Sequence, residues 1–302
     1  KTLVAARDPH GIRPLSVAVL GEKDNPKGCL LSVESCVFNN MGVSDFREVL
    51  PGETITIDKS GVKTVDMSPK TQMSCVFEFV YMMRPDSKFF GETVYKTRRE
   101  AGRQLWREAP VELAEEEDLV IMPVPNSGRP SAIGYFHEAQ KDLGLRVTYD
   151  EGLLSNAYFG RNFIKSAGKR KAYLKFYPIL EILKDKVVAL VDDSIVRGDT
   201  TSTLVEILML AGVKKVHHRI ASPPIKHPCH WGVAMPTYKE LLANRIPSIK
   251  DREKYLGVAS LGHLSLDGLI NAAGVSKDKL CTHCFDGEGP PLSVRGTVPL
   301  RE

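Results

Sequence analysis

The chain has 302 residues, of which 42% are hydrophobic and 26% are charged, and its formal net charge at pH 7 is +4. This length and composition indicate a globular protein with one large or two ordinary domains. No apolar run approaches the ~20 residues of a membrane-spanning helix, and the basic residues are spread among acids, so we expect a cytoplasmic protein that binds neither membranes nor nucleic acid.

The first segment, residues 1–74, alternates short apolar stretches with turn signals. Leu15 to Leu20 and Thr54 to Ile57 are two of the apolar stretches, and Asp8 to Gly11 and Pro51-Gly52 are two of the turn signals. Short alternating runs separated by such turns are typical of antiparallel strands. We therefore expect a β-rich segment here.

From Tyr95 to about Ala114 the pattern becomes helical, and strand-like and helix-like runs then alternate. The predicted strands are residues 119–124, 187–191 and about 216–221, and the predicted helices between them are residues 131–143 and 201–211. Continuous apolar strands joined by helices indicate an α/β fold with a central parallel sheet. Beyond about Ala273 the chain is rich in Gly and Pro, which suggests a tail wrapped on the body.

One strand-to-helix junction carries chemistry. The strand ends in Asp192-Asp193, and the loop from Ser194 to Thr201 leads into a helix. Two adjacent acids suit a sugar diol or a hard cation, and a glycine-containing loop at a helix N-terminus offers N–H groups to a phosphate. The alternative is an ordinary acidic N-cap, but a cap does not require the Ser-Ile-Val-Arg-Gly-Asp-Thr that follows.

This junction and several other motifs resemble the amidophosphoribosyltransferases of purine synthesis, also called glutamine phosphoribosylpyrophosphate amidotransferases. The resemblance runs nearly from end to end. It is carried, in order, by Arg7-Asp8-Pro9-His10-Gly11-Ile12-Arg13-Pro14-Leu15, Arg84-Pro85-Asp86-Ser87, Val124-Pro125-Asn126-Ser127-Gly128-Arg129-Pro130, the Asp192 loop, and Ala221-Ser222-Pro223-Pro224-Ile225-Lys226-His227-Pro228-Cys229.

The resemblance implies which residues bind phosphoribosyl pyrophosphate. Asp192 and Asp193 would hold the ribose hydroxyls and Mg²⁺, with Ser127 completing the metal site, although on residue type alone Ser127 is an ordinary turn serine. The other substrate-binding residues that the resemblance implies are Ser194, then Val196, Arg197, Gly198, Asp199, Thr200 and Thr201 for the 5-phosphate, and Pro125, Asn126, Ser127, Gly128 and Arg129 for the pyrophosphate.

The implied reaction is displacement of pyrophosphate from C1 of the ribose by ammonia, which in a complete family member comes from glutamine. Tyr158 and Arg161, in a loop expected to close over the substrate, would be the catalytic residues. The family usually has cations where this chain has Ser155 and Ala157. Asp199 is also unexpected, because it places a carboxylate in a loop that should receive a phosphate.

The spacing Cys281-Thr282-His283-Cys284 suits a metal, a cluster or a redox dithiol. The resemblance adds Cys75 and Cys229, and implies that these four residues hold a structural [4Fe–4S] cluster, with zinc as the alternative. Cys29 and Cys36 match no ligand position, and we expect them to be small core residues.

The architecture that the resemblance implies is a β-rich remnant of an N-terminal-nucleophile glutaminase domain (1–74), a type I phosphoribosyltransferase domain with a central parallel sheet (75–272), and a cluster-binding tail (273–302). The nucleophilic cysteine of the family would lie before Lys1. Family members also imply a homo-oligomer, a tetramer, and purine nucleotides as inhibitors.

Two other interpretations remain open. One is a divergent paralogue that binds phosphoribosyl pyrophosphate or nucleotides without catalysis, as a sensor or assembly subunit, which the changes at Ser155 and Ala157 favour. The other is a salvage transferase that takes a nucleobase, in which the Arg7 to Leu15 motif and the four cysteines would have no purpose.

Overall fold

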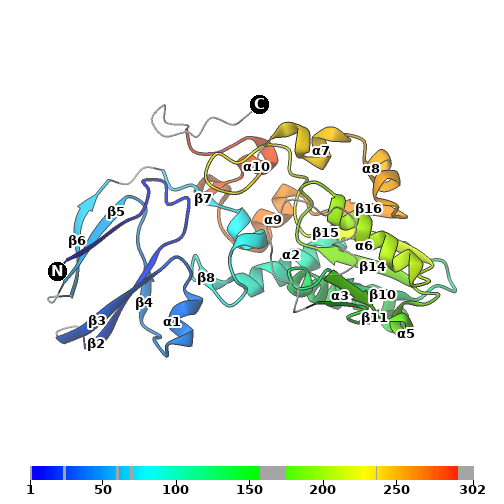
Figure 1. Ribbon diagram of the computed structural model, residues 1–302, viewed down its shortest axis with the longest axis horizontal. Coiled ribbons are helices and arrows are strands. Elements are labelled where there is room, and N and C mark those ends of the chain that lie inside the picture. Colours follow the sequence, from blue (N-terminus) through cyan, green and yellow to red (C-terminus); the bar gives the residue numbers. More distant parts are fainter. Residues whose placement is uncertain are drawn as a thin grey trace. The chain divides into compact units, whose positions relative to one another are not determined.

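The computed structural model describes residues 2–22, 25–58, 61–68, 71–156, 175–235 and 237–291 (Figure 1). These residues form two compact units. The first comprises the described residues of Lys1–Tyr95, His230–Gly232 and Gly274–Val298, and the second comprises those of Lys96–Cys229 and Val233–Ala273. A separate cluster of buried apolar side chains lies in each unit.

Two antiparallel three-stranded sheets make up much of the first unit, as the alternating pattern predicted. One has the strand order β1 (Leu3–Ala6), β5 (Glu53–Asp58), β6 (Gly61–Met67), and the other has the order β3 (Asn25–Ser32), β2 (Ser16–Glu22), β4 (Phe46–Glu48). Val17 from β2 and Ile55 from β5 are buried in one cluster with Val49. The two sheets therefore share a core.

The rest of the first unit consists of short elements. They are α1 (Cys36–Asn40), β7 (Ser74–Cys75), the π-helical turn η1 (Glu78–Met82), β8 (Lys88–Phe89), β9 (Glu92–Thr93), the 3-10 turn η4 (Lys277–Lys279), β17 (Leu280–Cys281) and α10 (His283–Asp286). β7 pairs with β17 in parallel, which places Cys281 opposite Cys75. This pairing brings together two segments that are about 200 residues apart in sequence.

A five-stranded, wholly parallel sheet forms the centre of the second unit. Its strand order is β11 (Val147–Tyr149), β10 (Leu119–Pro123), β14 (Val187–Asp192), β15 (Lys215–Ile220), β16 (Ser260–His263). β10 is buried along its whole length and β14 up to its last residue, as expected for strands covered on both faces. The α/β fold with a parallel sheet that the sequence predicted is confirmed.

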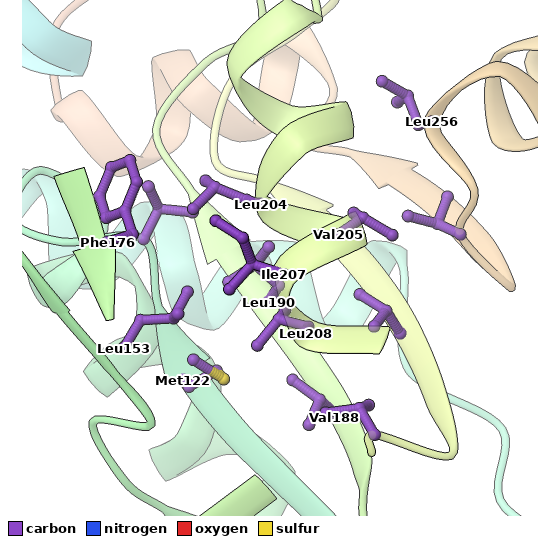
Figure 2. Close-up of a cluster of buried hydrophobic side chains, with 14 of the residues drawn as sticks. Met122, Leu153, Phe176, Val188, Leu190, Leu204, Val205, Ile207, Leu208 and Leu256 are labelled. Carbon is purple, nitrogen blue, oxygen red and sulfur yellow. The ribbon is translucent and has the colours of Figure 1, made fainter. Parts of the chain in front are cut away.

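The helices and turns of the second unit lie around this sheet. They are α2 (Val94–Glu108), α3 (Arg129–Leu143), η2 (Gly144–Arg146), α5 (Leu180–Leu183), α6 (Asp199–Leu210), η3 (Tyr238–Glu240), α7 (Leu242–Arg245), α8 (Ile249–Leu256) and α9 (Leu266–Ala273), together with the hairpin of β12 (Leu153–Ser155) and β13 (Phe176–Pro178). Figure 2 shows side chains of α6 and the hairpin beside Met122, Val188 and Leu190 of the sheet, and Leu256 of α8 in the same buried cluster.

Several element bounds differ from the sequence-based expectations for local reasons. α2 ends at Glu108, short of the expected Ala114, because Pro110 disfavours a helical conformation at Ala109, the residue before it. α3 starts two residues earlier than expected, with Pro130 in its first turn, where the missing N–H costs nothing. The short strands β11 and β16 were not predicted. Among the described residues, no helix combines the length and apolar character needed to cross a membrane.

The strand order places a topological switch point between β10 and β14. The chain passes from β10 to β11 on one side, then returns to add β14, β15 and β16 on the other. In such sheets a crevice opens where the order reverses, beyond the carboxyl ends of the two strands. The residues after Pro123 and those after Asp192 therefore meet at one edge.

Candidate functional site at the switch point

The two loops at the switch point are joined through their backbones. The N–H of Val124 donates to the carbonyl of Val191 (2.8 Å), and the N–H of Gly128 donates to the carbonyl of Val124 (3.1 Å). A Cβ atom at Gly128 would collide with the carbonyl oxygen of Val191. Gly128 is therefore required by space, and it holds the loop after β10 against the end of β14.

The acid pair at the end of β14 is tightly organised. The N–H of Asp193 donates to Oδ1 of Asp192 (2.9 Å), and the hydroxyl of Ser194 donates to Oδ1 of Asp193 (2.7 Å). Ser127, from the other loop, also forms a hydrogen bond with the Asp193 side chain. The structure thus brings together three residues that the sequence analysis assigned to one metal site.

Burial makes this pair a poor place for two negative charges. It raises the pKa of Asp192 well above its ordinary value, and the neighbouring Asp193 raises it further. Burial also raises the pKa of Asp193, opposed by its hydrogen bonds to Ser127 and Ser194. A bound cation would favour the ionised pair, and carboxylate and hydroxyl oxygens are the donors that Mg²⁺ prefers. The donor set therefore fits magnesium.

Two cations that sequence reasoning missed face this pair. Arg98, buried on α2, lowers the pKa of Asp193, and Lys175, just before β13, lowers that of Asp192. The Lys175 ammonium also lies 5.0 Å from the centre of the Phe176 ring. Neither residue stands in a motif that points to the acid pair, because only the packing of α2 and of the hairpin brings them there.

The loop after the acid pair leads into α6, whose N-terminus has no side-chain cap. The N-cap residue of α6 is Gly198, with φ of +88°, and no side chain caps it. Asp192 and Asp193 precede the helix by several residues, so the interpretation of this pair as an ordinary N-cap is wrong. The first-turn N–H groups of α6 are left for an anion, which the helix dipole favours.

The side chains of this loop differ in their surroundings. Thr201 is buried and Thr200 is exposed. Arg197 is paired with Glu240 (3.1 Å). The carboxylate of Asp199 lies 3.5 Å from the hydroxyl of Tyr255 on α8, and so is held by a residue outside the loop.

In the loop after β10, Pro125 is buried, Asn126 is exposed and Ser127 is half-buried. Arg129, expected to bind pyrophosphate, begins α3 and forms an ion pair with Glu151 (2.8 Å). A ligand phosphate would have to compete with Glu151 for this guanidinium. The predicted catalytic residues Tyr158 and Arg161, and Ala157, lie outside the described residues, whereas Ser155 ends β12.

The four predicted cluster ligands are distributed over both units. Cys75, Cys281 and Cys284 are buried in the first unit, where burial raises the pKa of Cys75 to about 12. Cys229 belongs to the second unit, and its N–H donates to the carbonyl of Met235 (3.2 Å). Across the described ranges, no three His, Cys, Asp or Glu residues are grouped as a metal site. The pairing of β7 with β17 places Cys75 opposite Cys281, and the cluster stays a prediction.

The two remaining cysteines were expected to be core residues. Cys36 is buried at the start of α1, as expected, but Cys29 on β3 is only half-buried. None of the six cysteines, all of which are described, is part of a disulfide bond.

Sequence comparisons place the chain beside enzymes of one name. It is 42% identical to an amidophosphoribosyltransferase of Mycobacterium tuberculosis over 98% of its own length and 55% of that protein. It is 38% identical to one of Methanothermobacter thermautotrophicus, covering 95% and 58%, and 39% identical to the chloroplastic amidophosphoribosyltransferase 1 of Arabidopsis thaliana, covering 97% and 50%. The chain thus spans half to three fifths of these relatives. No protein-family model matches it.

Solved structures give the same picture. A glutamine phosphoribosylpyrophosphate amidotransferase from B. subtilis, in complex with ADP and GMP, superposes with a TM-score of 0.84 at 34% identity, over 98% of this chain and 63% of that one. A structure described as the allosteric regulatory enzyme of purine biosynthesis gives a TM-score of 0.85 at 33% identity, over 99% and 62%.

Proposed function

We propose that this chain, which is related to the amidophosphoribosyltransferases over 98% of its length, carries the site at which such an enzyme transfers a phosphoribosyl group to ammonia. The product would be 5-phosphoribosylamine, at the entry to purine synthesis. In a complete enzyme the ammonia would come from glutamine. The chain spans about half the length of its curated relatives, so the proposal concerns the transferase half of the reaction.

One observation carries the proposal. At the switch point of the parallel sheet, an acid pair of raised pKa lies directly before a loop that leaves the N-terminus of α6 open. A phosphorylated sugar has both a diol and a phosphate, and a diphosphate leaving group binds a hard cation. Few other ligands would bind both to the acid pair and to the uncapped N-terminus of α6.

Each part of the substrate has a counterpart in the chain. Val196 to Thr201 would bind the 5-phosphate through N–H groups and hydroxyls. Asp192 and Asp193 would hold the ribose hydroxyls and, with Ser127, Mg²⁺. The metal, when bound, would neutralise the charge of the departing pyrophosphate. Pro125 to Arg129 would hold the pyrophosphate from the opposite side, once Arg129 exchanges its Glu151 partner for phosphate oxygens.

The reaction needs little covalent help from the protein. The lone pair of ammonia attacks C1 with inversion, the bond from C1 to the pyrophosphate oxygen breaks, and the new ammonium group loses a proton. The protein has to position the two reactants and stabilise positive charge at C1 and negative charge on the leaving group. Arg98 and Lys175 keep the acid pair nearer to its ionised form. Tyr158 and Arg161 remain our candidates for closing over the substrate.

The remaining expectations are part of the proposal. The first segment, residues 1–74, would be the end of an N-terminal-nucleophile glutaminase domain, 75–272 the transferase domain, and 273–302 the tail. Cys75, Cys229, Cys281 and Cys284 would hold a [4Fe–4S] cluster or zinc, and the parallel pairing of Cys75 with Cys281 supports a shared group. A homotetramer inhibited by purine nucleotides is proposed from the relatives, one of which was solved with ADP and GMP.

The test is pyrophosphate release from phosphoribosyl pyrophosphate by anaerobically purified protein, with Mg²⁺ and ammonium chloride. We expect ammonia-dependent turnover, and a loss of about 100-fold or more in an Asp192→Asn/Asp193→Asn variant, because both the metal ligands and the diol contacts are removed. Tight binding of phosphoribosyl pyrophosphate without turnover would instead identify a non-catalytic paralogue.

A further inference from the structure

The loop expected to bind phosphate is supported from behind by one segment of the second unit. This segment, Leu242 to Leu256, contains α7 and α8, and we refer to it as the strap. The N–H of Leu242 donates to the carbonyl of Val196 (2.8 Å). The side chains of Leu242 and Leu256 pack over Gly198, so that a Cβ there would lie 3.0 and 3.4 Å from them. The strap therefore fixes the backbone of the loop.

Arg245 of the strap makes a second contact with the loop. Its Nη2 donates to the carbonyl of Arg197 (3.0 Å) and to the hydroxyl of Tyr255 (3.0 Å). An Nη group carries two protons, so it can serve both acceptors at once. The guanidinium also lies over the Tyr255 ring, 5.1 Å from its centre. The two side chains are thus held together by a hydrogen bond and a cation–π contact.

Tyr255 links Arg245 to Asp199 in the phosphate loop. Its hydroxyl accepts from Arg245 and donates its own proton to Oδ1 of Asp199 (3.5 Å). The direction is fixed because arginine has no acceptor and an ionised carboxylate has no donor. The result is a chain of hydrogen bonds from Arg245 through Tyr255 to Asp199.

The carboxylate of Asp199 would oppose phosphate binding if it faced the inside of this loop. It is the first residue of α6, where its carboxylate could accept the same first-turn N–H groups that a phosphate would use. It would also repel a phosphate dianion. The contact with Tyr255 directs the carboxylate toward the strap instead.

We propose, on the basis of the phosphate site proposed above, that Tyr255 and Arg245 are positioning residues for phosphate binding. By holding the carboxylate of Asp199 against the strap, they leave the N–H groups of the loop to a sugar phosphate. Tyr255 is 42% exposed, and Asp199 and Arg245 are exposed as well. Exposed contacts of this kind add little to folding stability, so substitutions at these residues should leave the protein folded.

The test is binding of ribose 5-phosphate to the full chain, measured by calorimetry with Mg²⁺ present. We expect Tyr255→Phe to raise the dissociation constant about three- to tenfold, the range of one hydrogen bond. The KM for phosphoribosyl pyrophosphate should rise similarly, with kcat nearly unchanged. Tyr238→Phe is the matched control, because Tyr238 is also about half exposed but its hydroxyl faces His227 (3.3 Å), and it should bind like the parent.

A double-mutant cycle separates positioning from a purely structural role. In an Asp199→Asn background the repelling charge is gone, so adding Tyr255→Phe should change the dissociation constant very little. An undiminished effect in that background would overturn the inference, as would parent-like binding by the Tyr255→Phe single variant. A parent protein that does not bind ribose 5-phosphate at all would refute the phosphate site itself, and the inference with it.

Discussion

His218 lies fully buried on β15, and neither of its ring nitrogens has a hydrogen-bond partner among the described residues. Burial lowers its pKa to about 3, with smaller contributions from His263 and Arg219. Burial likewise lowers the pKa of His263, on the neighbouring strand β16, to about 4. Both histidines are therefore neutral in the folded protein at pH 7 and resist protonation.

This predicts a loss of stability in mild acid. The unfolded chain binds protons at these histidines below about pH 6.5, whereas the folded chain does so only near pH 3 to 4, so the free energy of unfolding falls as the pH drops through that window. We expect the His218→Gln variant to lose less stability than the parent between pH 6.5 and 4.5, by about 2 kcal/mol. Urea unfolding at the two pH values measures this, and equal losses would contradict it.

At the scale of elements, α2 and α3 cross at two glycines. A Cβ atom at Gly102 would collide with the carbonyl of Ser131, and one at Gly134 would collide with the carbonyl of Arg99. The hydroxyl of Ser131 also donates to the carbonyl of Arg98 (3.1 Å). This close crossing fixes α2 against α3, and with it the position of Arg98 beside the acid pair.

We therefore expect Gly134→Ala to separate the two helices. Overpacking of this kind costs about 1–3 kcal/mol. Displacement of Arg98 should in addition weaken binding of phosphoribosyl pyrophosphate, because Arg98 favours the ionised form of Asp193. Thermal unfolding and calorimetry measure the two effects. Gly28→Ala is the control, because a Cβ there makes only an ordinary contact with Leu20 at 3.6 Å. Equal behaviour of the two variants would show that the crossing tolerates a methyl group.

At the scale of the whole molecule, each unit has its own apolar core. The larger core joins the parallel sheet to α6, α8 and the hairpin (Figure 2), whereas the smaller one joins the two antiparallel sheets. Leu190 is fully buried in the centre of the larger core. Because Asp192 is the last residue of β14 and Asp193 follows it, the same core that stabilises the second unit also fixes the site.

Truncation of Leu190 to alanine should cost about 2–5 kcal/mol, as expected for a large side chain removed from a packed core. Hydrogen exchange should show lost protection in the strands of the second unit, while β2 and β5 of the first unit keep theirs. The reciprocal change, Val17→Ala, should lower protection in the first unit. Loss of protection spread evenly over both units would contradict separate cores.

Much of the fold could be predicted because the signals are local. The apolar runs that became β10 and β14 are long enough to be recognised, whereas β11 and β16 have only three and four residues and carry little periodicity. Of the candidate site, the acid pair and its loop are contiguous in sequence. Arg98 lies 95 residues before Asp193, and Lys175 lies 17 residues before Asp192. No spacing rule connects either residue with the acid pair.

By itself, then, the sequence determined the parallel sheet, the antiparallel first segment and the strand–loop–helix junction at Asp192, since these follow from side-chain periodicity and from residues that are neighbours along the chain. Only the tertiary structure decided that Cys75 and Cys281 lie opposite each other in paired strands, that Ser127 bonds to Asp193, and that Asp199 turns toward Tyr255. The physical reason is that such contacts depend on how helices and strands pack, which is set by the burial of many side chains at once.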